Sequence, residues 1–255
     1  MTIEEAIRIL WDAIQQGDHF PAALQGKLSL DDAYRVQLGI LARQVEAGEQ
    51  QSGWKVAISG AALRQARGLA EPVFGYLLAS GHFISGQTLP YGDIPNPAIE
   101  SELFITMGQR RQGPDVTRAQ TLEAVAKIEP AFEVVSMRSN MTADMALGVA
   151  DNIAQWGYVT GDAMVPYPKD LLLAEVTAHI RRNGQVEAQV RSADVLDDQL
   201  DSIAWLANAL ARYDLALEEG HGVLTGSFTR PTPVAKGDQW TTQFSDVGAV
   251  TTSFV

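Results

Sequence analysis

Residues 97–107, Pro-Ala-Ile-Glu-Ser-Glu-Leu-Phe-Ile-Thr-Met, constrain the fold of this chain more than any other segment. Ile, Phe and Thr dominate the segment and an Asn-Pro turn precedes it, a pattern that predicts a β-strand. Because side chains alternate across a strand, Glu100 and Glu102 share one face, while Ile99 and Ser101 share the other. Burying two unpaired carboxylates costs on the order of several kcal/mol. A divalent cation between them would offset that cost, whereas a solvent-exposed edge strand would need no ligand.

Two further charged residues lie in apolar segments. Glu133 is the only carboxylate in Ala-Phe-Glu-Val-Val, which we expect to form a strand. Three carboxylates together with water molecules would satisfy Mg²⁺. Lys55 lies in a short strand expected over 53–59. Its ammonium group either extends to solvent or is a desolvated amine beside a charged partner, where it could transfer protons.

The chain has no cysteine, which excludes disulfides, zinc–thiolate sites and thiol nucleophiles. Its four histidines do not form a metal-binding pair, so a metal site would use oxygen ligands and favour Mg²⁺ or Mn²⁺. The net charge of −12, without a cluster of Lys and Arg, argues against nucleic acid and an anionic membrane surface as partners. A small anionic substrate fits only if a local cation offsets this charge.

Hydrophobic periodicity predicts two N-terminal helices, over 2–16 and from Ser29 to a stop at Gly48. Strands with few helices between them follow, which indicates an α+β fold with a largely β core. We therefore expect a small helical cap over 1–50 and a catalytic domain over 51–255. The acidic N-terminus does not resemble a signal peptide, and no apolar run is long enough to span a membrane, so we expect a cytoplasmic protein.

Further elements are expected in the second half of the chain. A helix is predicted from Thr117 to about Ile128, ending at the Glu-Pro dipeptide that follows. The remaining predictions are strands over 171–181 and 185–191, a helix over about 199–213, and a terminal hairpin over 238–255.

Six motifs occur in an order that resembles a known family. They are Gly-x-Lys-Val (53–56), Pro-x-Phe-Gly (72–75), Pro-x-Ile-Glu-x-Glu (97–102), Pro-Ala-x-Glu-Val-Val (130–135), Ala-Asp-Asn (150–152) and Leu-Thr-Gly-Ser (224–227). This order is similar to that of the 2-keto-4-pentenoate hydratase / 4-oxalocrotonate decarboxylase family, within the fumarylacetoacetate hydrolase-like superfamily. The resemblance covers nearly the whole chain and implies a mixed β-sheet roll or barrel core behind the helical cap.

The resemblance also implies the site residues. Metal binding would fall to Glu100, Glu102 and Glu133, with Mg²⁺ or Mn²⁺. The implied catalytic set is Lys55, Ser59, Asp151 and Asn152, with Ser59 as the hydroxyl where the family has threonine.

The implied reaction begins from a small anionic 2-oxo acid. Its leading form is hydration of a 2-hydroxy-2,4-dienoate to a 4-hydroxy-2-oxo acid, as in aromatic catabolism. The alternative is decarboxylation of 2-oxo-3-hexenedioate, because both reactions use the same enolate. An acylpyruvate hydrolase and a non-catalytic partner subunit are further alternatives. The family implies a homo-oligomer, and a complex with a sister hydratase or decarboxylase.

Apart from Ser59, the chain departs from the family pattern at three places. Val73 stands where the hydratases carry an acid and resembles the decarboxylases, and Ala154 replaces a family serine. The Asp197-Asp198 pair replaces a Gly-His-Pro turn. These changes leave the expected metal ligands intact and leave the choice between hydration and decarboxylation open.

Overall fold

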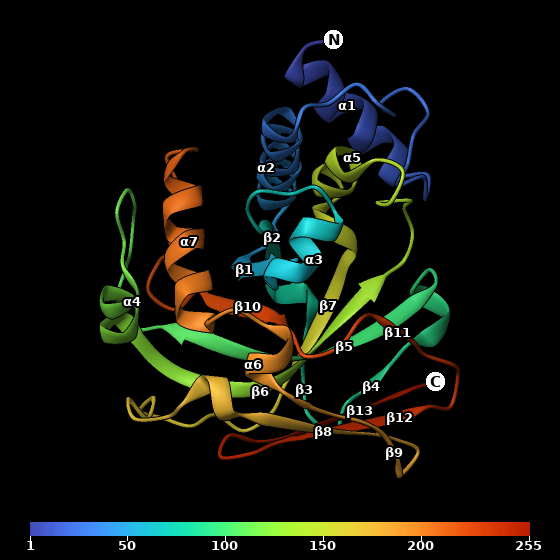
Figure 1. Ribbon diagram of the computed structural model, residues 1–255. Coiled ribbons are helices and arrows are strands. Elements are labelled where there is room, and N and C mark those ends of the chain that lie inside the picture. The colour runs from blue at the N-terminus through green and yellow to red at the C-terminus, as the bar shows by residue number, and fades with distance from the viewer.

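Two β-sheets form the centre of the protein, whose computed structural model describes residues 1–255 (Figure 1). The first sheet has the order β2-β1-β10-β5-β6-β7-β3, with β11 paired to β5, and the second has the order β4-β13-β12-β8-β9. The strands of the first sheet are β1 (Gln51–Ala57), β2 (Val73–Leu78), β3 (His82–Ile84), β5 (Pro97–Met107), β6 (Val125–Ser136), β7 (Gln155–Thr160), β10 (Gly222–Ser227) and β11 (Thr232–Pro233). Those of the second sheet are β4 (Thr88–Leu89), β8 (Thr177–Arg182), β9 (Gln185–Arg191), β12 (Gln239–Phe244) and β13 (Gly248–Phe254).

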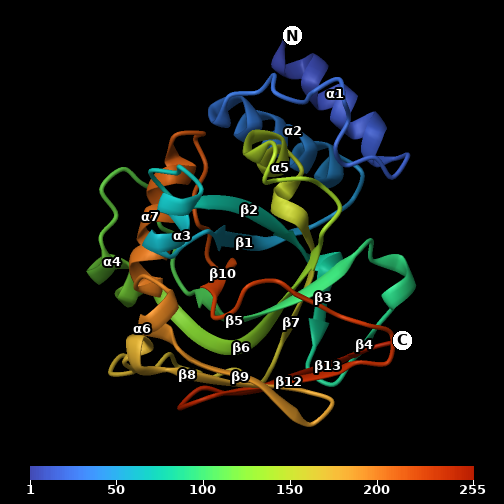
Figure 2. The same cartoon turned by 45° about the vertical axis from the view of Figure 1, so that its right-hand side comes forward.

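The first sheet curls into an open barrel in Figure 2, with α-helices above it and on its left side and the second sheet beneath β5 and β6. The helices α1, α2 and α5 gather at one end, and α7 lies to one side of the barrel (Figures 1 and 2). The α-helices are α1 (Ile3–Ile14), α2 (Leu30–Glu46), α3 (Ala61–Ala66), α4 (Arg118–Ala124), α5 (Met145–Ala150), α6 (Ser192–Val195) and α7 (Gln199–Ala211). Short 3₁₀ turns are η1 (Ala79–Gly81), η2 (Tyr91–Asp93), η3 (Asn152–Ala154) and η4 (Leu173–Glu175). None of the helices is long and apolar enough to cross a membrane.

The two N-terminal helices form as the sequence predicts. Thr2 and Ser29 cap α1 and α2, each in a capping box that satisfies free backbone N–H groups of the first turn. The buried faces of both helices, which include Leu10 and Ile40, belong to the same hydrophobic core as the sheets. The division of the chain into 1–50 and 51–255 stays a prediction.

Strand β5 is buried on both faces. On the outer face, the Ser101 hydroxyl lies 2.8 Å from the Thr242 hydroxyl of β12. Near it, Phe228 and Phe244 join the two sheets edge to face, with ring centroids 5.2 Å apart. The inner face of β5, which carries Glu102, points into the barrel. The Glu-x-Glu strand is therefore a central strand, and the exposed-edge interpretation is wrong.

Two boundaries differ from those expected. The helix from residue 117 ends at Ala124, and β6 then runs through Pro130, which pairs with Leu103 of β5. Pairing along β5 thus overrides the local break that proline signals. The strand expected over 171–181 begins only at Thr177, because η4 precedes it. The helix near 199–213 and the terminal hairpin are confirmed.

We expect Phe244→Ala to lower the free energy of unfolding by about 3 to 5 kcal/mol, because it opens a cavity between the sheets. Urea denaturation measures this change. The matched control is Val186→Ala on β9, where the side chain is 68% exposed, and we expect a change within about 0.5 kcal/mol. Equal effects of the two substitutions would contradict the described packing of the sheets.

Candidate metal centre and active site

Three glutamates meet inside the barrel. The β5–β6 register places Glu100 opposite Glu133, and Glu102 follows on the same face of β5. One carboxylate oxygen from each glutamate lies within 4.8 Å of the others, and Glu102 and Glu133 are each only 2% exposed. Burial, and next the charge of Glu133, raises the pKa of Glu100 to about 8. The same two causes raise the pKa of Glu102 well above its usual value.

Lys55 completes this cluster from the opposite wall. Its Nζ atom donates hydrogen bonds to the Glu133 carboxylate and, at 3.1 Å, to the Ile153 carbonyl. Strands β10 and β5 separate β1 from β6 in the sheet, so this contact crosses the barrel interior. The side chain is only 2% exposed. The structure therefore excludes the solvent-exposed interpretation of this lysine.

The charges of these four residues match a divalent cation. Three carboxylates and one ammonium group leave two negative charges in a buried cluster when all four are ionised. The backbone N–H of Gly226 donates to Glu102 Oε2 at 3.0 Å, which orients that carboxylate. Carboxylate oxygens at one point are the donor set that Mg²⁺ and Mn²⁺ prefer. The residues present thus fit such an ion.

Ser59 lies beside this donor. It is 3% exposed and lines the cavity that contains the glutamates. A Cβ atom on Gly226 would lie 2.1 Å from Ser59 Oγ, and Gly226 has a φ of +117°. Only glycine allows both this approach and this backbone conformation. The Leu-Thr-Gly-Ser motif therefore brings the hydroxyl next to the glutamate cluster.

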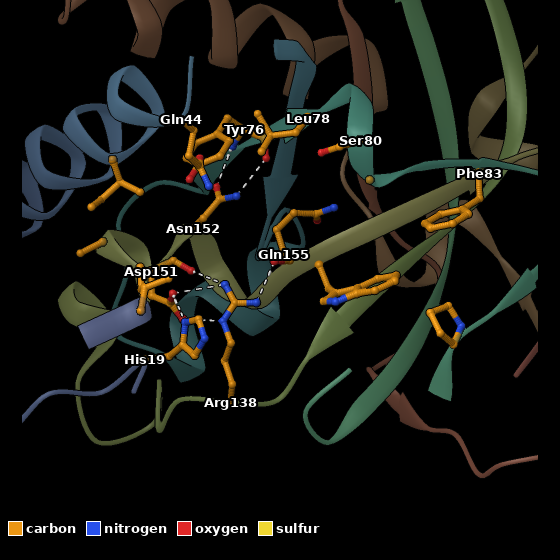
Figure 3. Close-up of a pocket in the computed structure, with 16 residues that line it drawn as sticks. His19, Gln44, Tyr76, Leu78, Ser80, Phe83, Arg138, Asp151, Asn152 and Gln155 are labelled. Carbon is orange, nitrogen blue, oxygen red and sulfur yellow. Dashed lines mark hydrogen bonds and ion pairs between the residues drawn. The ribbon is translucent and has the colours of Figure 1, made fainter. Parts of the chain in front are cut away.

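The side chain of Asp151 lies outside this cavity, against a second one of about 390 Å³ (Figure 3). Its carboxylate accepts a 2.9 Å hydrogen bond from Arg138 Nε and lies 2.9 Å from His19 Nδ1. These contacts tie the loop after α1 to the start of η3. The structure therefore does not bring Asp151 together with the glutamates.

Asn152 also points away from the glutamates, and Figure 3 shows it bonded to Tyr76. Its side-chain oxygen accepts from the Tyr76 N–H at 2.8 Å, and its side-chain nitrogen donates to the Tyr76 carbonyl at 3.0 Å. Asn152, Ile153 and Ala154 all have a positive φ, which is costly for a β-branched residue such as Ile153. This turn aims the Ile153 carbonyl at Lys55. Asn152 is thus placed to position the lysine through the turn.

The cavity around the glutamates has a volume of about 370 Å³ and is lined largely by residues with no recognisable sequence signal. Apart from the residues already described, its main side chains are Leu63, Arg67, Val135, Met137, Met141, Met145, Val195, Leu196, Thr229 and Arg230. Most of these residues come from loops and short helices, where no sequence periodicity predicts which way a side chain points. Arg67 and Arg230 are the charged residues of this lining that the sequence did not predict.

The three departures from the family pattern have different surroundings. Ala154 lines the cavity, whereas Val73 is buried in the hydrophobic core. Asp197 pairs with Arg64 at 2.8 Å, and Asp198 caps α7. Of these departures, only Ala154 is among the residues that line the cavity.

Comparisons with known proteins agree with this geometry. The family model described as fumarylacetoacetate (FAA) hydrolase C-terminal matches residues 47–255. The chain is 30% identical to 2-oxo-hept-4-ene-1,7-dioate hydratase of Escherichia coli, over 90% of this chain and 88% of that protein. It is 29% identical to 2-keto-4-pentenoate hydratase of Paraburkholderia xenovorans, over 98% and 94%. The structure of 4-oxalocrotonate decarboxylase from Pseudomonas putida, complexed with magnesium and adipate, has a TM-score of 0.92 and 25% identity, over 100% and 99% of the two chains.

We expect Mg²⁺ binding to strengthen as the pH rises from 6 through about 8, because the ion binds the ionised form of Glu100. Binding at pH 7 should release protons, which calorimetry in two buffers of different ionisation enthalpy measures. The raised pKa also means that the folded, metal-free protein keeps a proton that the unfolded chain loses above pH 4.5, so its stability should fall toward pH 8. An affinity independent of pH would contradict this prediction.

We expect Asn152→Ala to lower the free energy of unfolding by about 2 to 4 kcal/mol, because it leaves both backbone groups of Tyr76 without their partner. Asn152→Asp keeps an acceptor for the Tyr76 N–H but places a buried carboxylate oxygen against the Tyr76 carbonyl, so it should cost at least as much as Asn152→Ala. Urea denaturation compares the two variants. A loss below about 0.5 kcal/mol for Asn152→Ala would show that the side chain does not hold the turn.

Proposed function

This chain belongs to the fumarylacetoacetate hydrolase family, and from this premise we propose that it is a divalent-metal-dependent lyase acting on an unsaturated 2-oxo acid. The leading reaction is hydration of a 2-hydroxy-2,4-dienoate to a 4-hydroxy-2-oxo acid. Two of the relatives described above are hydratases of this kind, each similar over about nine-tenths or more of the present chain. Decarboxylation of 2-oxo-3-hexenedioate is the second candidate, favoured by the likeness in structure to 4-oxalocrotonate decarboxylase.

The observation that carries this proposal is the buried contact of Lys55 with the glutamate cluster. A Mg²⁺ or Mn²⁺ ion held by Glu100, Glu102 and Glu133 would supply positive charge where the 2-oxo oxygen of the substrate gains negative charge. Lys55 is the only ammonium group at this cavity. Its hydrogen bonds to Glu133 and the Ile153 carbonyl hold the amine at a fixed position, from which it can give or take a proton.

Hydration needs a proton and a water molecule at neighbouring carbons. The dienol first becomes a conjugated 2-oxo-3-enoate by losing its 2-hydroxyl proton and gaining a proton at C5. The oxygen of water then bonds to C4 and loses a proton, while C3 gains a proton, so the step needs no oxidant or reductant. In our proposal Lys55 carries the proton, and the Ser59 hydroxyl at the cavity wall orients water or substrate. Asp151 and Asn152 contribute by holding the turn that contains Ile153.

The other functions have less support. Likeness to fumarylpyruvate hydrolase of Pseudomonas aeruginosa, at 17% identity and a TM-score of 0.63, shows the shared fold alone. A non-catalytic partner subunit would leave the intact cluster of Lys55 and the glutamates without a role.

For assembly, we propose a homo-oligomer. Its support is the exposure of large apolar side chains on a single copy, such as Val165 and Leu172, each 69% exposed. A complex with a sister enzyme and a cytoplasmic location stay predictions.

We expect Lys55→Met to lower kcat by about 10²- to 10⁴-fold, the usual contribution of a positioned acid–base group, while Mg²⁺ still binds. Glu102→Gln should instead weaken Mg²⁺ binding at least about tenfold, because it removes one anionic ligand. Hydration is measured by the loss of dienol absorbance with 2-hydroxypenta-2,4-dienoate, and decarboxylation by the release of CO₂ from 2-oxo-3-hexenedioate. Calorimetry measures Mg²⁺ binding.

Lys169→Met, at an exposed lysine outside the cavity, serves as the matched control and should leave both readouts unchanged. Chelator treatment should abolish turnover, and added Mg²⁺ or Mn²⁺ should restore it. Full turnover by Lys55→Met would disprove the role given to this lysine. Turnover that survives complete metal removal would disprove the role of the metal.

A further inference from the structure

Two guanidinium groups line the cavity of the glutamate cluster without a carboxylate partner. Arg67, at the end of α3, donates only to the Thr142 hydroxyl, at 3.2 Å. Arg230 lies in the loop between β10 and β11, and its guanidinium has no hydrogen-bond partner in the protein. By contrast Arg64, one turn before Arg67 on α3, pairs with Asp197 at 2.8 Å. The chain carries 31 acidic and 19 basic residues, so unpaired arginines at a cavity are not explained by a shortage of carboxylates.

The cavity separates this positive charge from the metal-binding end. Glu102, Glu133 and Lys55 are each 2% exposed, whereas both arginines are exposed to solvent. One divalent cation would neutralise the cluster of three carboxylates and one ammonium group. The arginines would still contribute two positive charges at the open end. A substrate with a single carboxylate, held at the metal, would leave them without a counter-charge.

Apolar side chains make up 12 of the 23 residues that line the wall of this cavity, among them Ile58, Leu63, Met141, Met145, Ile153 and Leu196. Such a wall suits an uncharged carbon chain, and unbranched methionine side chains adapt to its shape. The cavity as a whole therefore has a site for an acidic head, an apolar middle and a cationic mouth.

We propose that Arg67 and Arg230 bind a second carboxylate at the far end of the substrate, so that the enzyme acts on an unsaturated 2-oxo dicarboxylate. This inference rests on the proposed function and assigns the substrate class and the tail-binding residues. Guanidinium groups recognise carboxylates through paired, charge-assisted hydrogen bonds. Of the relatives described above, the E. coli hydratase is named for a 1,7-dioate and the P. xenovorans hydratase for a monocarboxylate, so the names alone leave the class open.

The same arginines select hydration over decarboxylation. In decarboxylation of 2-oxo-3-hexenedioate, the bond from the tail carboxylate to the chain breaks, and its electron pair moves through the conjugated carbons toward the 2-oxo oxygen. The tail thus loses its negative charge. Guanidinium groups paired with that carboxylate stabilise the ground state more than the transition state, which slows the step. Hydration leaves the tail carboxylate intact, so the same contacts serve binding without opposing the reaction.

The kinetic test compares two substrates with the Mg²⁺-loaded enzyme. We expect kcat/KM to be at least about tenfold higher for 2-hydroxyhepta-2,4-dienedioate than for 2-hydroxypenta-2,4-dienoate, the contribution of a charge-assisted hydrogen bond. Arg67→Met and Arg230→Met should each raise KM for the dicarboxylate about tenfold, with kcat within about twofold and the monocarboxylate unaffected. Arg181→Met, at an exposed arginine on β8 outside this cavity, is the matched control.

A binding test without turnover keeps the two proposals distinguishable. Calorimetry should show that the Mg²⁺-loaded enzyme binds adipate more tightly than hexanoate, which has the same chain length but only one carboxylate. Arg67→Met and Arg230→Met should each remove this difference in affinity. Equal binding of the two acids, or equal turnover of both dienols by wild type, overturns the tail site while the proposed function stands. CO₂ release from 2-oxo-3-hexenedioate as fast as hydration overturns the selection of hydration. If wild type turns over neither dienol and releases no CO₂ from 2-oxo-3-hexenedioate, the proposed function fails, and the adipate measurement alone decides the tail site.

Discussion

The hydrogen-bonded ion pair between Lys55 and Glu133 connects opposite walls of the barrel. It joins strands that lie three places apart in the sheet order, so it forms only when the sheet curls into a barrel. Both groups are buried, and removing one partner of such a pair typically costs about 3 to 5 kcal/mol. The curl also brings Glu100 and Glu102 to the same point. Closure of the barrel therefore also assembles the glutamate cluster.

Two stretches of backbone with positive φ position the residues around this ion pair. Gly226 adopts a conformation that suits glycine, and its N–H reaches Glu102. The turn of Asn152, Ile153 and Ala154 is left-handed throughout, and its cost is offset by the two bonds from Asn152 to Tyr76 and by the ion pair of Asp151 with Arg138. Because His19 also contacts Asp151, the N-terminal segment is coupled to the position of the lysine.

The sequence predicts the centre of the site better than its rim. Alternation along strands placed Glu100, Glu102 and Glu133 on buried faces, because a strand has only two faces and its register follows from pairing. The α+β class and the two N-terminal helices followed from periodicity and capping. Local rules failed at Pro130, where pairing with β5 continued a strand that the sequence interrupts. The direction of Asn152 could not be predicted, because a left-handed turn reverses which side a side chain faces. Nor could loop arginines such as Arg67 be distinguished from ordinary surface residues.

We propose that the three glutamates and Lys55 form one metal centre. Anomalous diffraction from crystals grown with Mn²⁺ tests this arrangement. We expect one strong peak inside the barrel, at about 2.1 to 2.2 Å from an oxygen of each of Glu100, Glu102 and Glu133, a typical metal–carboxylate distance. Lys55 should remain in contact with Glu133 beside the ion. Mn²⁺ bound elsewhere in an enzyme that Mn²⁺ activates, with no peak at these carboxylates, would disprove this metal centre.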